Sequence, residues 1–161
     1  IYTLEYDDSN KKKEQSYINT NQSYAFADNK VTASYGSATA KKHADTTWTQ
    51  QQIDDGDAPD GADTDTVAVE GLKTILINTI KSQAEGELNR TDWYITRKAE
   101  KNTAIPSAIT THRDAVRSKQ AAMETAITNA SDTPALETLY TYTTDSDGVQ
   151  SRPLGELPTL E

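Results

Sequence analysis

The chain has 161 residues, of which 34% are hydrophobic, and a formal net charge of −9. This length fits one domain, or one domain with a small appendage, and the apolar content lies below the usual ~45–50% (a range that also counts Gly), so we expect a modest core. The acidic balance argues against nucleic-acid binding, because phosphate contacts need clustered Lys and Arg.

Residues 1–53 are predicted to form a β-rich module. Tyr2, Leu4 and Tyr6 alternate with polar residues, which is the period of a half-buried strand. A polar run at 7–16 indicates an exposed turn, and residues 24–26 and 31–35 indicate two more strands joined by a tight turn. We expect a small antiparallel sheet that needs a helix packed against it. Residues 38–53 are ambiguous: a short helix capped by Asp45 or Thr46 would carry Trp48, which we expect in the core.

Residues 54–65 hold six Asp side chains together with Gly and Pro, and no large apolar residue. This composition predicts a solvated linker or surface loop. A calcium-binding loop of the EF-hand type is the more specific alternative, since Asp55 and Asp57 fit its ligand positions 1 and 3. Pro59 and Thr66 occupy two later positions at which a calcium loop needs oxygen ligands, so the solvated loop is favoured.

A helix is predicted from about Thr66 to Leu88, capped by Thr64 or Asp65. Its apolar face is formed by Val69, Leu72, Ile75, Leu76 and Ile80. Beyond Ile80 the face turns polar, and this half is expected to fray into solvent or to meet a partner.

A second helix is predicted from about Pro106 to Ala130, because apolar residues recur there at spacings of three and four. His112 falls on the apolar face of this helix and is expected at the edge of the core as a neutral side chain. A metal site at His112 is not favoured, because His43 is the only other histidine and the chain has no cysteine to complete a set of ligands.

The C-terminal part is predicted to begin with a short helical turn at Asp132, followed by a β hairpin at Asp147-Gly148. The tail that follows is too rich in Pro and Gly for a central strand and should be an extended segment. The fold class is therefore α+β: an N-terminal sheet at 1–53, an acidic linker at 54–65, and a helical hairpin with a short β or extended end at 66–161.

Residues 91–117, TDWYITRKAEKNTAIPSAITTHRDAVR, form the most informative segment. Thr91 and Asp92 precede the aromatic pair Trp93 and Tyr94. Ile-Pro then opens a new segment that carries Arg113 and Arg117 four residues apart, on one helix face. We expect Asp92 to pair with one of these arginines and Trp93 to fill the gap between the two helices. The basic residues of this segment form either a solvated face or a dock for the acidic linker or an acidic partner.

This spacing resembles the C-terminal domain of bacteriophage tail-fibre assembly proteins and related small phage tail proteins. In those proteins a helix ends in Thr-Asp-Trp, and a second helix begins near a Pro and carries a similar Arg face. The resemblance covers about residues 66–120, and more loosely the chain to 161. It implies a phage structural or assembly role.

No catalytic pattern accompanies this segment. The sequence has no nucleophile elbow, phosphate-binding Gly-rich loop, zinc-protease motif or thiol. Because these motifs are absent, we expect no enzymatic activity and no cofactor. Because long apolar runs are absent, we expect no membrane span and no signal peptide. The absence of cysteine fits synthesis in a reducing cytosol.

Two functions remain. The first is a virion structural protein of the tail, neck or fibre apparatus, and the second is a tail-fibre assembly factor that is absent from the finished particle. Either would act by contacts with other phage proteins or with copies of itself. We expect these contacts at the N-terminal sheet and at Leu154 and Leu157 of the tail. For the Thr91–Tyr94 motif a structural role is favoured, and a partner contact is the alternative.

Overall fold

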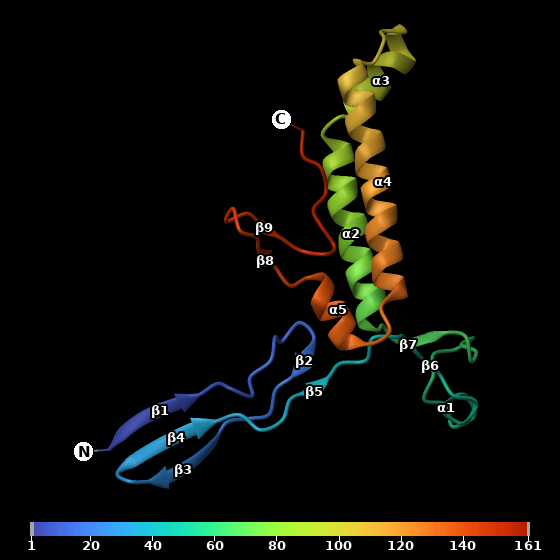
Figure 1. Ribbon diagram of the computed structural model, residues 1–161. Coiled ribbons are helices and arrows are strands. Elements are labelled where there is room, and N and C mark those ends of the chain that lie inside the picture. Colours follow the sequence, from blue (N-terminus) through green and yellow to red (C-terminus); the bar gives the residue numbers. More distant parts are fainter. Residues whose placement is uncertain (1, 161) are drawn as a thin grey trace. The chain divides into compact units, whose positions relative to one another are not determined.

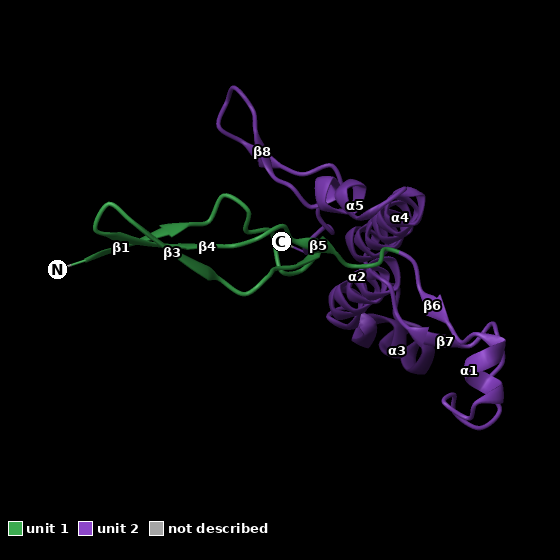
Figure 2. Ribbon diagram, turned by 90° about the horizontal axis from the view of Figure 1, so that it is seen from below, with its two compact units in different colours: residues 1–43 green, residues 44–161 purple. Residues whose placement is uncertain are grey.

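The computed structural model describes residues 2–160 and confirms the α+β class. The chain forms two compact units, residues 1–43 and 44–161 (Figure 2). The division falls after His43 rather than at residue 53, because residues 46–47 pair with a strand of the second unit. None of the described helices is long and apolar enough to cross a membrane.

The first unit is built on a three-stranded sheet in the order β1-β4-β3 (Figure 1). The strands are β1 (Thr3–Asp7), β3 (Ser23–Ala27) and β4 (Lys30–Ser34), close to the predicted ranges. Asp28 and Asn29 adopt left-handed φ angles of 51° and 59°, which allow the tight β3–β4 turn. A two-residue ladder of β2 (Tyr17–Ile18) and β5 (Thr39–Ala40) follows.

The expectation of a fully antiparallel sheet is wrong for β1, which pairs with β4 in parallel. The β3–β4 hairpin places β4 between β1 and β3, so β4 runs antiparallel to β3 and parallel to β1. No helix lies within residues 2–43, so the sheet has no helix of its own unit packed against it.

The second unit is built on a helical hairpin of α2 (Leu72–Asn89) and α4 (Ser107–Asn129), which lie side by side in Figure 1. The start of α2 meets the end of α4, where Lys73 Nζ donates to Thr128 O at 2.8 Å. The short helix α5 (Thr133–Leu139) closes this end where a helical turn was predicted, and Asp132 caps it by accepting from Ala135 N. Buried aliphatic side chains of these helices and of the tail form the core: Leu72, Leu76, Ile80, Met123, Ile127, Ala130, Leu136 and Leu154.

The predicted start of α2 near Thr66 is wrong. Val67–Val69 is a strand, β7, paired with β6 (Thr46–Thr47), and the helix begins at Leu72 after Gly71. The carboxylate of Asp45 caps it from a distant part of the chain, accepting from Gly71 N at 2.6 Å and from Thr74 Oγ1 at 2.8 Å. A Cβ at Gly71 would lie 2.3 Å from the Ala44 carbonyl carbon, so the close approach requires glycine.

The ambiguous segment does form a short helix, α1 (Gln50–Asp54), but neither Asp45 nor Thr46 caps it. Thr49 does so, in a reciprocal capping box with Gln52. Trp48 is half-buried rather than part of the core. In the acidic segment that follows, Asp63 accepts hydrogen bonds from Asp65 N and Thr66 Oγ1, at 3.1 and 2.8 Å.

The C-terminal hairpin is confirmed as β8 (Thr143–Thr144) and β9 (Gln150–Ser151). Gly148 has a φ of +79°, and the Asp145 carboxylate accepts from the Asp147 and Val149 backbone. The extended tail then returns along α2 (Figure 1).

Candidate functional site

The Thr91–Tyr94 motif does not end a helix but starts one. After α2 ends at Asn89, a third helix, α3 (Asp92–Lys101), begins at Asp92 and closes at Asn102, which is left-handed with a φ of 51°. The predicted helical hairpin did not include α3, because residues 96–101 show no apolar periodicity.

Arg113 holds the junction between α2 and α3. Its Nη1 lies 2.8 Å from Leu88 O, 2.7 Å from Thr91 Oγ1 and 2.7 Å from Asp92 Oδ1. Thr91 is fully buried and Arg113 is 8% exposed. One buried guanidinium from α4 therefore binds the end of one helix and the start of the next, and we call this network the Arg113 clamp.

The clamp confirms the predicted pairing of Asp92 with an arginine and identifies it as Arg113. Arg117 does not share this role, because it is exposed and pairs with Asp114 at 3.4 Å. The two arginines lie on the same helix four residues apart, yet one is buried at the junction and the other is solvated.

The expectation that Trp93 fills the gap between the helices is wrong, since Trp93 is 52% exposed. Thr91 and the Arg113 guanidinium occupy the junction instead, and α3 carries Trp93 outward. The Trp93 and Tyr94 rings lie 3.8 Å apart by their centroids. Arg97 covers both rings, with its Cζ 4.7 Å and 5.2 Å from the two centroids.

The sequence analysis counted Arg97 only among the basic residues of this segment and missed its contact with the two rings, although a signal for it exists. On a helix, residues three and four apart are neighbours, so a helix starting at Asp92 would bring Arg97 to both Tyr94 and Trp93. The Arg97 Nε is buried and has no hydrogen-bond partner among the described residues. We call Trp93, Tyr94 and Arg97 the α3 cluster.

Charges around the α3 cluster are mostly basic. Lys98 and Lys101 extend the positive charge of Arg97, against Glu100 alone on this part of the helix. The acidic segment does not dock here, because α1 and α3 lie at opposite ends of the α2–α4 hairpin (Figure 1). The basic end of this unit is therefore open to an external acidic group.

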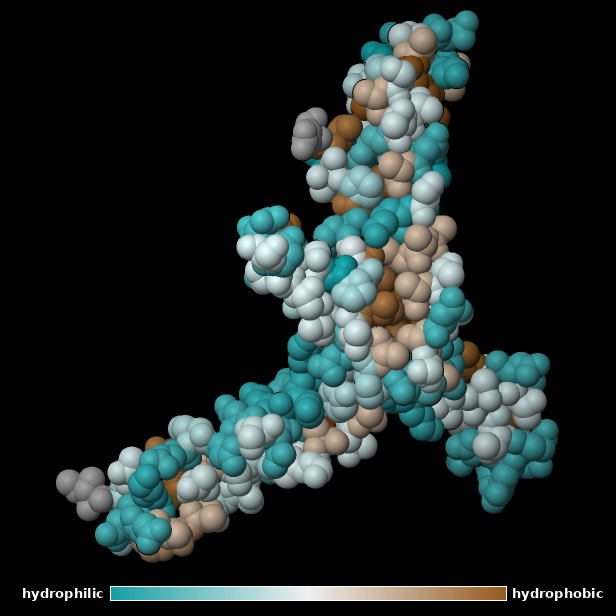
Figure 3. Space-filling model, in the orientation of Figure 1, coloured by the Kyte–Doolittle hydropathy of each residue, from teal (hydrophilic) through white to brown (hydrophobic). Residues whose placement is uncertain are grey.

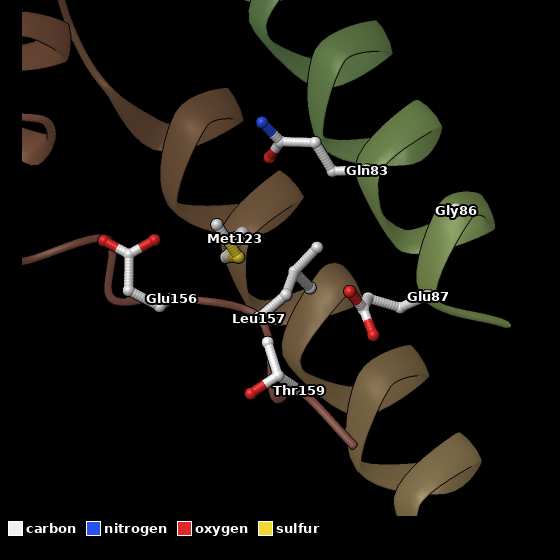
Figure 4. Close-up of a pocket in the computed structure, with 7 residues that line it drawn as sticks. All are labelled: Gln83, Gly86, Glu87, Met123, Glu156, Leu157 and Thr159. Carbon is white, nitrogen blue, oxygen red and sulfur yellow. The ribbon is translucent and has the colours of Figure 1, made fainter. Parts of the chain in front are cut away.

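The tail leucines have an internal role. Leu154 is 2% exposed, lies in the core and donates its N–H to Leu139 O at 3.0 Å, so it is not the exposed partner contact that the sequence suggested. Leu157 is half-buried and packs on the same core. The polar face of α2 beyond Ile80 meets this tail: Gln83 and Glu87 line a shallow hollow of about 320 Å³ together with Leu157 (Figure 4).

His112 lies where it was expected, buried on the inner face of α4. Its Nε2 has no hydrogen-bond partner among the described residues. Within residues 2–160, no group of three or more acidic or histidine side chains is arranged to hold a metal ion.

Comparison of the chain with protein-family models, with curated proteins and with solved structures finds no match. The resemblance of residues 91–117 to phage proteins therefore stays a prediction.

Proposed function

We propose that the chain is a non-enzymatic structural protein of a bacteriophage virion, in the tail, neck or fibre apparatus. It acts by protein–protein contacts, and the α3 cluster is its main contact for another virion protein. The observation that carries this proposal is the Arg113 clamp, which fixes α3 so that Trp93 is exposed beside the half-buried side chains of Tyr94 and Arg97.

The composition of the cluster supports a protein contact. Trp, Tyr and Arg are the residues most enriched among those that dominate binding energy at protein interfaces. Trp93 is half-exposed, with 52% of its surface open to solvent. The cation–π contacts of Arg97 hold the two rings in place before binding, which reduces the entropy lost when a partner docks.

The chemistry of the partner follows from the charge. Arg97, Lys98 and Lys101 favour an acidic rim around an apolar pocket that receives Trp93. The resemblance of residues 91–117 to phage tail-fibre assembly and small tail proteins supports a virion protein as this partner.

Mass spectrometry of gradient-purified particles, beside that of assembly intermediates from the same infected cells, tests the proposal. A structural protein is present in the finished particle in a constant ratio to the other tail proteins. Presence only in intermediates would favour the alternative, a tail-fibre assembly factor. Absence from both would refute both functions.

A further inference from the structure

The three-stranded sheet of the first unit has one apolar and one polar face. Residues that pair directly across strands point to the same side of a sheet, so the register defines each face. One pairing row runs through Leu4, Val31 and Phe26, and the next through Tyr6, Ala33 and Tyr24. These six residues, with Tyr2 stacked edge-on against Phe26 at 5.1 Å, form what we call the apolar face.

The opposite face is polar. Its rows hold Thr, Ser and Ala with the charged residues Glu5, Asp7 and Lys30, and Lys30 Nζ lies 2.7 Å from Glu5 Oε1. No charged residue lies on the apolar face. This separation is typical of a sheet that packs one face against another layer.

Within the described part of the first unit no such layer covers the apolar face, and apolar residues of this unit lie at its surface (Figure 3). Tyr6, Tyr24 and Phe26 are 66%, 67% and 62% exposed, and Leu4 is 49% exposed. Among the described residues of this unit, only Ser16 and Ala33 are buried. Removing this apolar surface from water is favourable, so an apolar layer from outside the unit would stabilise the sheet.

Charge favours a second copy of this unit as that layer. Residues 1–43 hold six Lys and five Asp or Glu side chains, which gives this unit a formal charge of +1. Because the whole chain has a formal charge of −9, residues 44–161 have a formal charge of −10. Two copies of the first unit meet with little electrostatic repulsion, whereas two copies of the second unit repel each other strongly. Electrostatic repulsion therefore opposes self-association less at the first unit than at the second.

The area is also adequate. From the exposed fractions of its aromatic and aliphatic side chains, the apolar face offers on the order of 600 Å² per copy. Two copies would bury about 1,200 Å², which is at the lower end of specific, stable interfaces. A face of this kind is self-complementary, because aromatic rings from two twisted sheets interdigitate at a spacing of about 10 Å.

We infer that the chain forms a two-fold symmetric dimer in which the apolar faces of two first units pack against each other. The inference rests on the proposed function for the chain's role as a structural protein. It adds a partner, a second copy of the chain, for the apolar face of the first unit. The dimer then presents two α3 clusters to the rest of the particle, one from each copy.

Sedimentation velocity of the full-length chain, with two neighbouring substitutions, tests this dimer. Tyr24→Lys places a charge on the apolar face, and Ala25→Lys places the same charge on the opposite face of the same strand. We expect a concentration-dependent dimer that Tyr24→Lys weakens by about tenfold or more and Ala25→Lys leaves unchanged. A monomer at high micromolar concentration, or equal behaviour of the two variants, would overturn the inference.

Cross-linking locates the contact independently. The natural chain has no cysteine, so Tyr24→Cys and Ala25→Cys each introduce a single thiol. A short bifunctional maleimide should join Tyr24→Cys chains into covalent dimers, while Ala25→Cys chains stay single. Efficient cross-linking at Ala25→Cys alone would place the contact on the wrong face and refute the proposal.

Salt and particle composition complete the test. Because salt screens the repulsion between the acidic second units, added NaCl should strengthen the dimer, and dissociation by salt would contradict an apolar interface. Absence of the chain from virions, with the dimer intact in solution, would refute the proposed function but not the dimer. A monomer that is nevertheless present in virions would refute the dimer alone.

Discussion

Replacing Arg113 with Ala is the most informative perturbation of the second unit. The change removes the donor to Leu88 O, Thr91 Oγ1 and Asp92 Oδ1 at once. Thr91 is fully buried, and its hydroxyl still donates to Leu88 O at 2.9 Å, as does the Thr91 N–H at 3.0 Å, so the substitution removes only the charged donor from these two groups. The Asp92 side chain is 52% exposed, so solvent compensates for most of its loss.

The magnitude follows from these three contacts. Hydrogen bonds to a charged donor contribute about 1.5–3 kcal/mol, the buried Arg113 side chain also loses its packing, and the half-exposed ion pair adds little. We therefore expect Arg113→Ala to lower the free energy of unfolding by about 2–4 kcal/mol. For a unit of this size the melting temperature should fall by roughly 10 °C, measurable by calorimetry or circular dichroism.

Two controls separate the clamp from a general charge effect. Arg117→Ala removes an exposed arginine four residues away, whose 3.4 Å contact to Asp114 should contribute less than about 0.5 kcal/mol. Asp92→Asn keeps an oxygen acceptor for Arg113 and should cost less than Arg113→Ala. If Arg113→Ala proves as mild as Arg117→Ala, the reasoning that the clamp holds α3 on α2 fails.

Three further predictions concern the core, the acidic segment and Tyr140. Leu76→Ala should cost roughly 2–5 kcal/mol because Leu76 is 6% exposed in the core, and an unchanged thermal midpoint would contradict this. Calcium or EDTA should leave the melting temperature unchanged, since Asp63 is engaged by Thr66 and Asp65; a calcium-dependent rise of several degrees would revive a metal site. Burial raises the pKa of Tyr140 above its usual value of about 10, so the folded chain holds this proton more tightly than the unfolded chain and stability should fall as the pH rises above about 10. Tyr140→Phe should reduce this alkaline loss and be neutral or slightly stabilising at pH 7, because the buried hydroxyl has no partner among the described residues; an equal alkaline loss in unfolding scans at pH 9 and 11 would refute it.

Local patterns predicted much of this fold. The strands of the first unit, α4, α5 and the Asp147-Gly148 turn each carry their signal within a few residues, through period-two alternation, helical spacing, an Asp cap or a turn dipeptide. The pairing of Asp92 with an arginine could also be predicted from the sequence, because the carboxylate and the arginines lie on either side of the junction between the two predicted helices.

Distant contacts decided the features that the sequence did not reveal. The start of α2 depends on Asp45, 26 residues before Gly71, and on the pairing of β6 with β7. Val69 fits the helical spacing of Leu72 and Leu76, but residues 67–69 contain two β-branched valines and form a strand. Likewise, the exposure of Trp93 follows from the burial of Arg113 in the junction, a charged side chain that composition alone would place in solvent.

The central claim is that the α3 cluster attaches the chain to a virion. The most direct measurement is quantitative mass spectrometry of gradient-purified particles assembled with either the natural chain or Trp93→Ala, with Trp48→Ala as the matched control. Trp93 is half-exposed on α3, so its loss should leave the melting temperature nearly unchanged. We predict that the natural chain and Trp48→Ala are incorporated and that Trp93→Ala falls by about tenfold or more. Equal incorporation of all three, or absence of the natural chain from the particle, would contradict the account.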